Sequence, residues 1–379
     1  MILAAGMFAL LLLGLHLVSV ALVLLRPYLR RAPDPAVGLP FIGLLRPVCG
    51  LDPFDAETLG SGFGLDYPDY EMIFCCAAAD DPVIPLIRGL IAAHPETSAR
   101  LLIGAEEISG NPKLNNLAKG WAATTADWIV MTDSNVVLPR DYLQQLLAAW
   151  SPGTGMVSSP PSGVRPQGIW GALECAFLNG YQARLQLAGD ALGMGFAQGK
   201  TLFTTRALID DAGGLAALGR DLAEDVACTK IVRAAGLRVR LAARPFAQPI
   251  GQRSLAAVWA RQLRWSQVRR HGFPGLFLIE PLSSPALPLL ALAAAVWGGL
   301  NWGLNWGLNW GLVALFLALW YGAEVVLCRA LRWPCAPRDL AAMPLRDLLL
   351  PVLWGATFAT RGFVWRGTSM APGRSQAGE

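Results

Sequence analysis

Charged side chains are scarce in this sequence, in which Asp, Glu, Lys and Arg together make up 15% of 379 residues. The formal net charge of +4 is too small to indicate a protein that binds nucleic acid through its phosphates, so we expect no nucleic acid partner. The seven cysteines form no Cys-x-x-Cys pair and no zinc-like spacing. We therefore interpret them as reduced, buried thiols of a cytosolic domain.

Several catalytic motifs are missing as well. No Gly-x-Ser-x-Gly elbow marks a serine nucleophile, and no glycine-rich loop marks a phosphate cradle. The run "QGKT", residues 198–201, lacks the preceding glycine that a Walker sequence needs. The chemistry must therefore be sought among carboxylates, and not in a Ser or Cys nucleophile.

Long apolar runs, in contrast, are present, and 54% of all residues are hydrophobic, more than in an ordinary soluble domain. Residues 2–25 carry no charge over a length that can cross the hydrocarbon core, and Arg26, Arg30 and Arg31 follow. By the positive-inside rule the N-terminus faces outward and the chain then enters the cytoplasm. We predict a transmembrane anchor at residues 1–26. A cleaved signal peptide is the weaker alternative, because no small-residue cleavage site is evident.

A second apolar region predicts two transmembrane helices within residues 286–329, where Glu324 is the one charged residue between positions 287 and 328. It contains the repeat "GLNWGLNWGLNWGL", residues 299–312. The repeat forms a polar seam for a partner helix or headgroup, or it is a tandem duplication tolerated at a turn, and we favour the duplication. We expect residues 340–366 to lie in the membrane interface or to re-enter from it, and residues 367–379 to form a polar tail.

The middle of the chain, residues 37–280, alternates short apolar runs with helix-like segments. This alternation predicts an α/β domain with a mostly parallel sheet flanked by helices. Ligands of such sheets bind outside the carboxyl ends of the strands. The run "FCCAAADDP" delivers Asp80 and Asp81 to such an end, and "DWIVMTDSN" delivers Asp133. Since a carboxylate there is a poor core residue and a good ligand, we expect the site at this edge.

Two further stretches carry charge in patterns with two interpretations each. Glu224 and Asp225 begin a predicted helix, where acids also complement the helix dipole. Arg261 and Arg264 share one face of a later helix beside Trp265. Such a basic helix suits anionic headgroups, and paired guanidinium groups equally suit a diphosphate. The residue pattern leaves both interpretations open.

Seven short motifs occur in an order and spacing that resembles the ceramide glucosyltransferases, over roughly residues 40–282. These enzymes are membrane-bound, inverting members of the nucleotide-sugar transferases. The resemblance implies a GT-A-type domain between N-terminal and C-terminal transmembrane helices, Mg²⁺ or Mn²⁺ as cofactor, UDP-glucose as donor and ceramide as acceptor. It also implies an integral protein of the bacterial inner membrane with its catalytic domain in the cytoplasm. The motifs are "LLRPVCGLDP", "LDYPDYE", "DDP", "NPKLNN", "TDSN", "AEDV" and "RQLRW".

The resemblance implies roles for the matching residues of the donor pocket. Asp81 would contact the uracil or the ribose, and Lys113 and Asn115 would line the same nucleotide pocket. Asp133 would bind the metal ion that bridges the diphosphate. Asp225 would be the catalytic base that accepts a proton from the acceptor hydroxyl.

The later motif is similar to the family's Arg/Gln-x-x-Arg-Trp sequence. The resemblance implies that Arg261, Arg264 and Trp265 bind the UDP-sugar, where guanidinium groups stabilise the charge of the departing diphosphate. Lys200 lies where the family places an acceptor-side loop, and a phosphate contact is the less favoured interpretation for it.

Two departures from the family pattern leave the substrates open. Asn135 stands where many relatives have the second acid of Asp-x-Asp, and a histidine of the animal enzymes is missing, with Gln182 in its neighbourhood. The main alternative is transfer of N-acetylglucosamine, galactose or glucuronic acid to a hopanoid or another membrane lipid. An alternative of another class is a non-catalytic nucleotide-sugar-binding membrane protein, which should tolerate the substitution Asp225→Asn.

Overall fold

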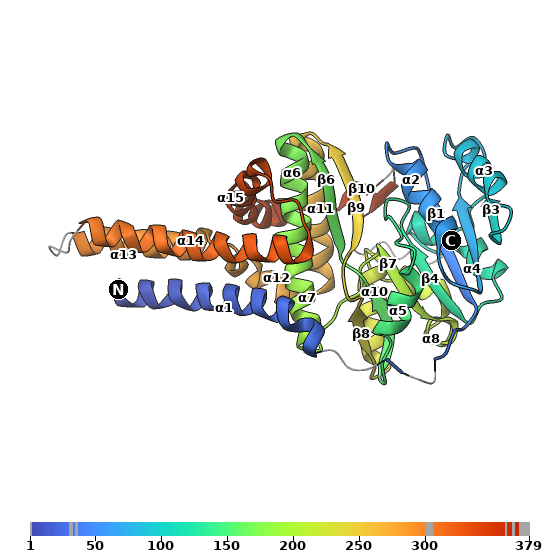
Figure 1. The fold of residues 1–379 in the computed structure, drawn as a ribbon, viewed down its shortest axis with the longest axis horizontal. Helices are drawn as coiled ribbons and strands as arrows, with labels where there is room; N and C mark the ends of the chain where they lie inside the picture. Colours follow the sequence, from blue (N-terminus) through green and yellow to red (C-terminus); the bar gives the residue numbers. More distant parts are fainter. Residues whose placement is uncertain are drawn as a thin grey trace. The chain divides into compact units, whose positions relative to one another are not determined.

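The computed structural model describes residues 2–29, 33–34, 37–300, 306–360, 362–365 and 368–370 (Figure 1). The chain forms two compact units, each assembled from segments that are distant in the sequence. The helical unit consists of Met1–Tyr28, Gly163–Ala188 and Ile250–Arg361. The sheet unit consists of Leu29–Ser162, Gly189–Pro249 and Gly362–Glu379. The domain boundaries expected from the sequence were drawn at the ends of the predicted transmembrane segments. They differ from the division into these two units, and they stay predictions.

The sheet unit is built on a seven-stranded sheet with the strand order β3-β2-β1-β4-β7-β5-β8. Strand β7 is antiparallel to both of its neighbours, β4 and β5, and the other pairs are parallel. The predicted α/β class with a mostly parallel sheet is therefore confirmed. The strands are β1 (Ile42–Val48), β2 (Tyr70–Cys76), β3 (Ala99–Ile103), β4 (Trp128–Thr132), β5 (Thr154–Ser158), β7 (Thr201–Thr205) and β8 (Arg238–Leu241).

Both faces of this sheet are buried, which explains why its central strand β4 reads as an almost continuous apolar run. Successive side chains of a strand point to opposite faces. Leu44 of β1 and Phe74 of β2 therefore belong to one core cluster, whereas Leu45 and Ile73 belong to the other. Helices α3 (Ile84–Ala93) and α5 (Tyr142–Ala149) pack into the first cluster, and α4 (Pro112–Ala123) and α10 (Glu224–Ala234) into the second.

Shorter elements complete the sheet unit. They are α2 (Asp55–Gly60), η1 (Ser61–Gly64), α8 (Arg206–Asp211), α9 (Gly214–Leu218) and the antiparallel pair β10 (Phe363–Trp365) and β11 (Thr368–Met370). Strands β6 (Pro161–Gln167) and β9 (Phe246–Gln252) pair in a separate two-stranded sheet, and the chain passes from one unit to the other along each of them.

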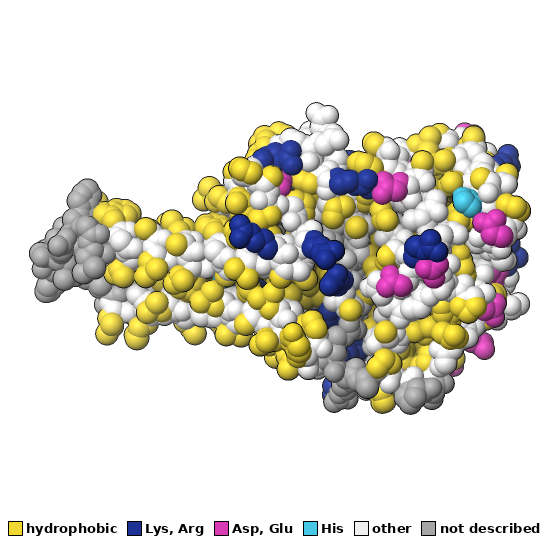
Figure 2. Space-filling model, in the orientation of Figure 1, with side chains coloured by type: hydrophobic (Ala, Val, Ile, Leu, Met, Phe, Trp, Pro, Cys, Tyr) yellow, Lys and Arg dark blue, Asp and Glu magenta, His cyan; other side chains and the backbone are white. Residues whose placement is uncertain are grey.

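The helical unit contains the segments that the sequence predicts to cross the membrane. Two of its helices, Leu3–Leu29 and Trp310–Leu331, are long and apolar enough to cross a membrane, and a pair bent by 48°, Pro274–Ser283 with Ala286–Trp297, is a third candidate. Figure 2 shows hydrophobic side chains along these helices. Part of the Gly-Leu-Asn-Trp repeat, residues 301–305, lies outside the described residues. The helices are α1 (Ile2–Leu29), α6 (Gly168–Ala176), the π-helix η2 (Phe177–Ala183), α7 (Arg184–Ala191), α11 (Leu255–Gly272), α12 (Pro274–Ile279), η3 (Glu280–Ser283), α13 (Ala286–Leu300), α14 (Trp306–Leu331) and α15 (Pro337–Ala359).

Helix α15 covers most of the region for which the sequence predicts an interfacial or re-entrant segment. It packs against α6 and α11 through a cluster that includes Leu173, Val258 and Leu350. Its place relative to a membrane stays a prediction.

Candidate active site

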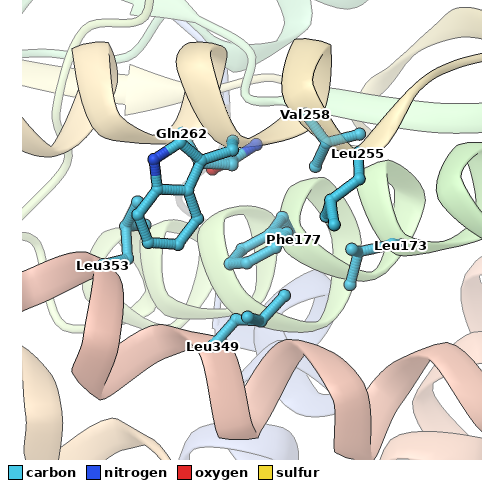
Figure 3. A pocket seen from close by; sticks show the side chains of 8 residues that line it. Leu173, Phe177, Leu255, Val258, Gln262, Leu349 and Leu353 are labelled. Carbon is cyan, nitrogen blue, oxygen red and sulfur yellow. The ribbon is translucent and has the colours of Figure 1, made fainter.

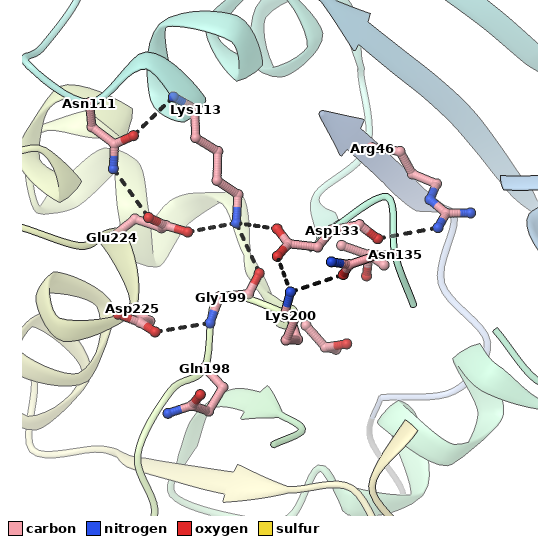
Figure 4. A network of polar contacts seen from close by, with 12 residues as sticks. Arg46, Asn111, Lys113, Asp133, Asn135, Gln198, Gly199, Lys200, Glu224 and Asp225 are labelled. Carbon is pink, nitrogen blue, oxygen red and sulfur yellow. Dashed lines mark hydrogen bonds and ion pairs between the residues drawn. The ribbon is translucent and has the colours of Figure 1, made fainter. Parts of the chain in front are cut away.

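Asp133 follows strand β4 directly and meets two lysines. The Asp133 carboxylate oxygen Oδ1 lies 2.6 Å from Lys113 Nζ, and Oδ2 lies 2.9 Å from Lys200 Nζ (Figure 4). Burial acts to raise the pKa of Asp133, but the two ammonium groups outweigh it and hold this pKa well below its usual range. Asp133 is therefore an anion at any physiological pH, and each of its carboxylate oxygens contacts an ammonium group.

Lys113 is fixed by the way helix α4 begins. The Asn111 side chain accepts a hydrogen bond of 2.9 Å from the Lys113 backbone N–H, and Pro112 occupies the first turn. The Lys113 ammonium also lies 2.6 Å from Glu224 Oε1 and donates to the Gly199 carbonyl at 2.9 Å. Burial acts to lower the pKa of Lys113, but the Asp133 and Glu224 carboxylates outweigh it and raise this pKa. Lys113 is the cation that joins both acids.

The two acids at the start of α10 have different surroundings. Glu224 is buried and accepts a hydrogen bond of 3.1 Å from the Asn111 amide in addition to its Lys113 contact. Asp225 accepts from the Gly199 backbone N–H at 3.1 Å and from the Val226 N–H at 2.8 Å. Burial and the neighbouring Glu224 carboxylate raise the pKa of Asp225 to about 7. A carboxylate with this pKa can accept a proton near neutral pH.

The loop before β7 connects these groups. Gly199 binds Asp225 through its N–H and Lys113 through its carbonyl, and the next residue, Lys200, contacts Asp133. The antiparallel direction of β7 explains the arrangement, because its first residue Thr201 pairs with the last residue of β4. The start of β7 therefore lies at the carboxyl end of β4, beside Asp133.

Gly199 also has little free space. A Cβ atom at this position would lie 2.8 Å from Glu224 Oε1 and 3.4 Å from Lys113 Nζ. A side chain here would have to displace the Glu224 carboxylate, which is the partner of Lys113.

The structure gives Asp81 and Asn115 backbone partners. Asp81 accepts hydrogen bonds from the Gly50 N–H at 3.0 and 2.9 Å and from the Val83 N–H at 2.9 Å. It thereby joins the loops that follow β1 and β2. Asn115 accepts from the Ile108 N–H at 3.1 Å and the Ser109 N–H at 3.0 Å, and it holds that loop against α4. Both residues shape the loops around the strand ends, and their nucleotide contacts stay predictions.

Arg46 is a member of the site that the sequence analysis did not identify. It is fully buried within β1, and its guanidinium donates to the carbonyl oxygens of Asp133 at 3.2 Å, Ser134 at 3.3 Å and Val136 at 3.2 Å. Burial lowers its pKa to about 10. Arg46 fixes the backbone of the turn that presents Asp133. An arginine inside an otherwise apolar strand was the signal in the sequence.

The predicted diphosphate-binding residues belong to the helical unit, on α11. Arg261 pairs with the fully buried Glu174 of α6, with 3.0 Å between Arg261 Nη1 and Glu174 Oε1. Burial raises the pKa of Glu174, which Arg261 opposes. Trp265 packs against Cys175, Leu178 and Ile250. The structure brings Asp133, Lys113 and Asp225 together within the sheet unit, and the contribution of α11 to the same site stays a prediction.

Gln262, the neighbour of Arg261, faces a small pocket of the helical unit (Figure 3). Its side chain accepts a hydrogen bond of 3.0 Å from Gln182 of the π-helix η2. The other lining side chains are apolar. They are Leu173, Phe177, Leu255, Val258, Trp259, Leu349 and Leu353.

A metal ion would find few protein ligands in the sheet unit. Among the described residues, no group of three or more His, Cys, Asp or Glu side chains is arranged to hold one. Asp133 Oδ2 and Asn135 Oδ1, however, both lie 2.9 Å from the same Lys200 ammonium. Two oxygens thus converge on one positive charge, which fits a Mg²⁺ or Mn²⁺ ion that takes its remaining ligands from phosphate and water.

Comparisons with known proteins identify the family of the chain. The sequence profile of Glycosyl transferase family 21 matches residues 7–376. Ceramide glucosyltransferase 1 of Caenorhabditis elegans is 27% identical over 269 residues, which are 70% of this chain and 57% of that protein. Ceramide glucosyltransferase of Komagataella phaffii is 40% identical over 99 residues, which are 25% of this chain and 19% of that protein. The chain thus spans little more than half the length of the nematode relative.

A solved structure shares the fold. The mannosyltransferase PcManGT from Pyrobaculum calidifontis, in complex with GDP-Man and Mn²⁺, superposes with a TM-score of 0.53 at 18% sequence identity. The match covers 91% of this chain and 99% of that one. At this identity the likeness concerns the fold alone, and it confirms the predicted GT-A-type architecture.

Proposed function

The chain belongs to glycosyl transferase family 21, and from this we propose that it transfers glucose from UDP-glucose to the primary hydroxyl of ceramide, giving a β-glucosylceramide. The family match over residues 7–376 supports the reaction class, and it agrees with the likeness to ceramide glucosyltransferases that the motifs indicate. The observation that carries the proposal is a cluster in which Gly199 contacts both Asp225 and Lys113, and Lys113 in turn contacts Asp133.

The donor half of the reaction needs stabilisation of the charge on UDP as it leaves. Asp133, together with Asn135, would hold Mg²⁺ or Mn²⁺, which when bound neutralises charge on the diphosphate. Lys113 keeps Asp133 ionised and oriented at 2.6 Å. Arg261 and Arg264 would supply guanidinium groups to the same diphosphate, where preorganised charge is most effective. Asp81, Asn115 and Trp265 would line the space for the nucleotide and the sugar.

The acceptor half needs a base. As the hydroxyl oxygen of the lipid bonds to the anomeric carbon, the bond from that carbon to the phosphate oxygen breaks, and the hydroxyl proton passes to the Asp225 carboxylate. Asp225 has a pKa of about 7, which suits proton transfer near neutral pH. Attack on the face opposite UDP inverts the anomeric centre, so an α-linked donor gives a β-glycoside.

The membrane supplies the acceptor. Two helices long and apolar enough to span a bilayer would keep the enzyme where a lipid can approach laterally. We place the protein in the bacterial inner membrane with the sheet unit in the cytoplasm, where UDP-sugars are available. The arginines after residue 25 support this orientation.

The decisive experiment identifies the product. The full chain in lipid nanodiscs is incubated with labelled UDP-glucose, UDP-N-acetylglucosamine, UDP-galactose or UDP-glucuronic acid, with ceramide or a hopanoid-containing extract. Mass spectrometry should find hexosylceramide from UDP-glucose. A labelled lipid without a long-chain base would overturn the ceramide assignment and leave the transfer mechanism standing. UDP binding without any product would instead favour a non-catalytic nucleotide-sugar-binding protein.

A further inference from the structure

Lys200 occupies the position between the two oxygens that the proposed function assigns to a metal ion. Its ammonium lies 2.9 Å from Asp133 Oδ2 and 2.9 Å from Asn135 Oδ1 (Figure 4). The side chains of Lys200 and Asp133 are only 13% and 26% exposed, so solvent screens this contact incompletely. Lys200 is one of just four lysines in the chain.

With Lys200 in place, two carboxylates of the cluster face two ammonium groups. The carboxylates of Asp133 and Glu224 face the ammonium groups of Lys113 and Lys200. A divalent cation that entered beside Asp133 would meet the Lys200 ammonium at hydrogen-bonding distance from both of its intended ligands. The repulsion between these charges in a partly desolvated site is strong, so the metal and the Lys200 ammonium exclude one another at this position.

The Lys200 ammonium can also move away from Asp133 and Asn135. A lysine carries its charge on a flexible four-carbon chain and makes contacts as a point charge, including contacts with phosphate. A diphosphate that arrives with a metal ion provides new negative charge beside the site. The ammonium can then exchange Asp133 for a phosphate oxygen, so that it keeps an anionic partner.

We propose that Lys200 is an internal counter-ion that holds the metal position between Asp133 and Asn135 until a metal-bound nucleoside diphosphate displaces it. The metal ion then binds together with the nucleotide and only weakly alone. This inference rests on the proposed function for the identity of the site as a donor site. It adds a residue that makes metal binding depend on the nucleotide.

The test measures Mn²⁺ binding directly, without glycosyl transfer. The full chain in nanodiscs is titrated with Mn²⁺, and free Mn²⁺ is followed by electron paramagnetic resonance with and without UDP. The variants are Lys200→Met and Lys200→Gln, which remove the charge, and Lys200→Arg, which keeps it. Lys230→Met is the matched control, because Lys230 pairs with Asp221 at the surface, 2.5 Å away.

The expected result is specific to the charge of Lys200. In the absence of UDP, Lys200→Met and Lys200→Gln should bind Mn²⁺ at least about tenfold more tightly than the wild type, whereas Lys200→Arg and Lys230→Met should not. UDP should improve Mn²⁺ binding by a smaller factor in the two neutral variants than in the wild type. Thermal melting identifies a variant that fails to fold. Since Met is apolar and Gln is polar, one of the two neutral variants can replace the other if it does not fold.

Two negative results are distinguishable. If the wild type binds Mn²⁺ with UDP but the neutral variants bind Mn²⁺ alone no better than the wild type, the counter-ion role of Lys200 is wrong and the proposed function is unaffected. If the wild type binds no Mn²⁺ even with UDP, the metal site of the proposed function is wrong, and the role of Lys200 fails with it.

Discussion

Gly199 donates its backbone N–H to the Asp225 carboxylate across 3.1 Å. The carbonyl of the same glycine accepts from Lys113 at 2.9 Å. One residue of the loop before β7 therefore fixes both the predicted catalytic base and the lysine that orients Asp133. The spacing between the Asp225 carboxylate and the Lys113 ammonium therefore depends on the backbone of Gly199.

Substitution Gly199→Ala should lower activity more than stability. The added Cβ would lie 2.8 Å from Glu224 Oε1, and Glu224 is itself held by Asn111 and Lys113. We expect kcat to fall about 10- to 100-fold, the usual effect of a misplacement of roughly 1 Å. Gly89→Ala in α3 is the control, because its Cβ would meet nothing within 4 Å and it should slightly stabilise the helix. Equal kcat values for the two variants would contradict the prediction.

Substitution Asp225→Asn should remove the proton acceptor. We expect transfer to slow by about 10²–10⁴-fold while UDP still binds. Since Asp225 acts as a base only when ionised and its pKa is about 7, wild-type kcat/KM should rise with pH and level off above this value. Steady-state rates between pH 5.5 and 9 provide the measurement. The control is Asp221→Asn, because Asp221 pairs with Lys230 and not with a residue of the site. If the Asp225→Asn enzyme reacted at the wild-type rate, Asp225 would not be the base.

The same pKa predicts a pH-dependent effect on stability. An unfolded Asp loses its proton near pH 4 (about 3.9), but folded Asp225 retains it up to about pH 7. Between these values the native state binds more protons than the unfolded state, so the free energy of unfolding falls as pH rises. Asp225→Asn removes this decrease in the free energy of unfolding, because Asn does not titrate. The melting temperature of Asp225→Asn relative to the wild type should therefore increase from pH 5 to pH 8, and a constant difference would show that Asp225 titrates normally.

The sequence predicted the parts of this site that depend on local pattern. The run at Tyr70–Cys76 is apolar from Met72 onward because both faces of the sheet are covered, and it forms β2 with the bounds expected from the sequence. Asp133 was identified because a polar residue ends an apolar run. Asp225 was identified through the motif "AEDV" of the family resemblance, because an acid at a helix start also complements the helix dipole. Each of these signals lies within a few residues of the side chain that it identifies.

Contacts that depend on strand direction could not be predicted in this way. Strand β7, with the sequence "TLFTT", is short and more than half polar, and its insertion between β4 and β5 depends on partners far along the chain. The contact of Lys200 with Asp133 follows from that insertion. Glu174 was missed for a similar reason, because its helix reads as an ordinary apolar segment and its partner Arg261 lies 87 positions later.

Glu174 should act as a positioning residue for Arg261. Its carboxylate is fully buried, whereas the Arg261 side chain is 24% exposed and 3.0 Å away. Glu174→Gln keeps the shape but weakens the charge-assisted hydrogen bond, so we expect the KM for UDP-glucose to rise about tenfold, or about 1.4 kcal/mol, with little change in kcat. Glu280→Gln is the control, because it breaks the pair with Arg269 farther along the same helix. Equal KM values for both variants would show that the contact of Glu174 with Arg261 has no part in donor binding.

Arg346 should be essential to the stability of the helical unit. Its guanidinium lies 2.9 Å from Glu324 of α14 and 2.8 Å from Asp347 of α15, and all three side chains are almost completely buried. Arg346→Met leaves two buried carboxylates without their shared cation, which typically costs about 3–5 kcal/mol. The melting temperature in detergent should fall sharply. The double variant Arg346→Met with Glu324→Gln should recover part of the loss, because it removes one uncompensated charge. If the double variant melts below the single variant, the loss comes from packing around Arg346 and not from unpaired charge.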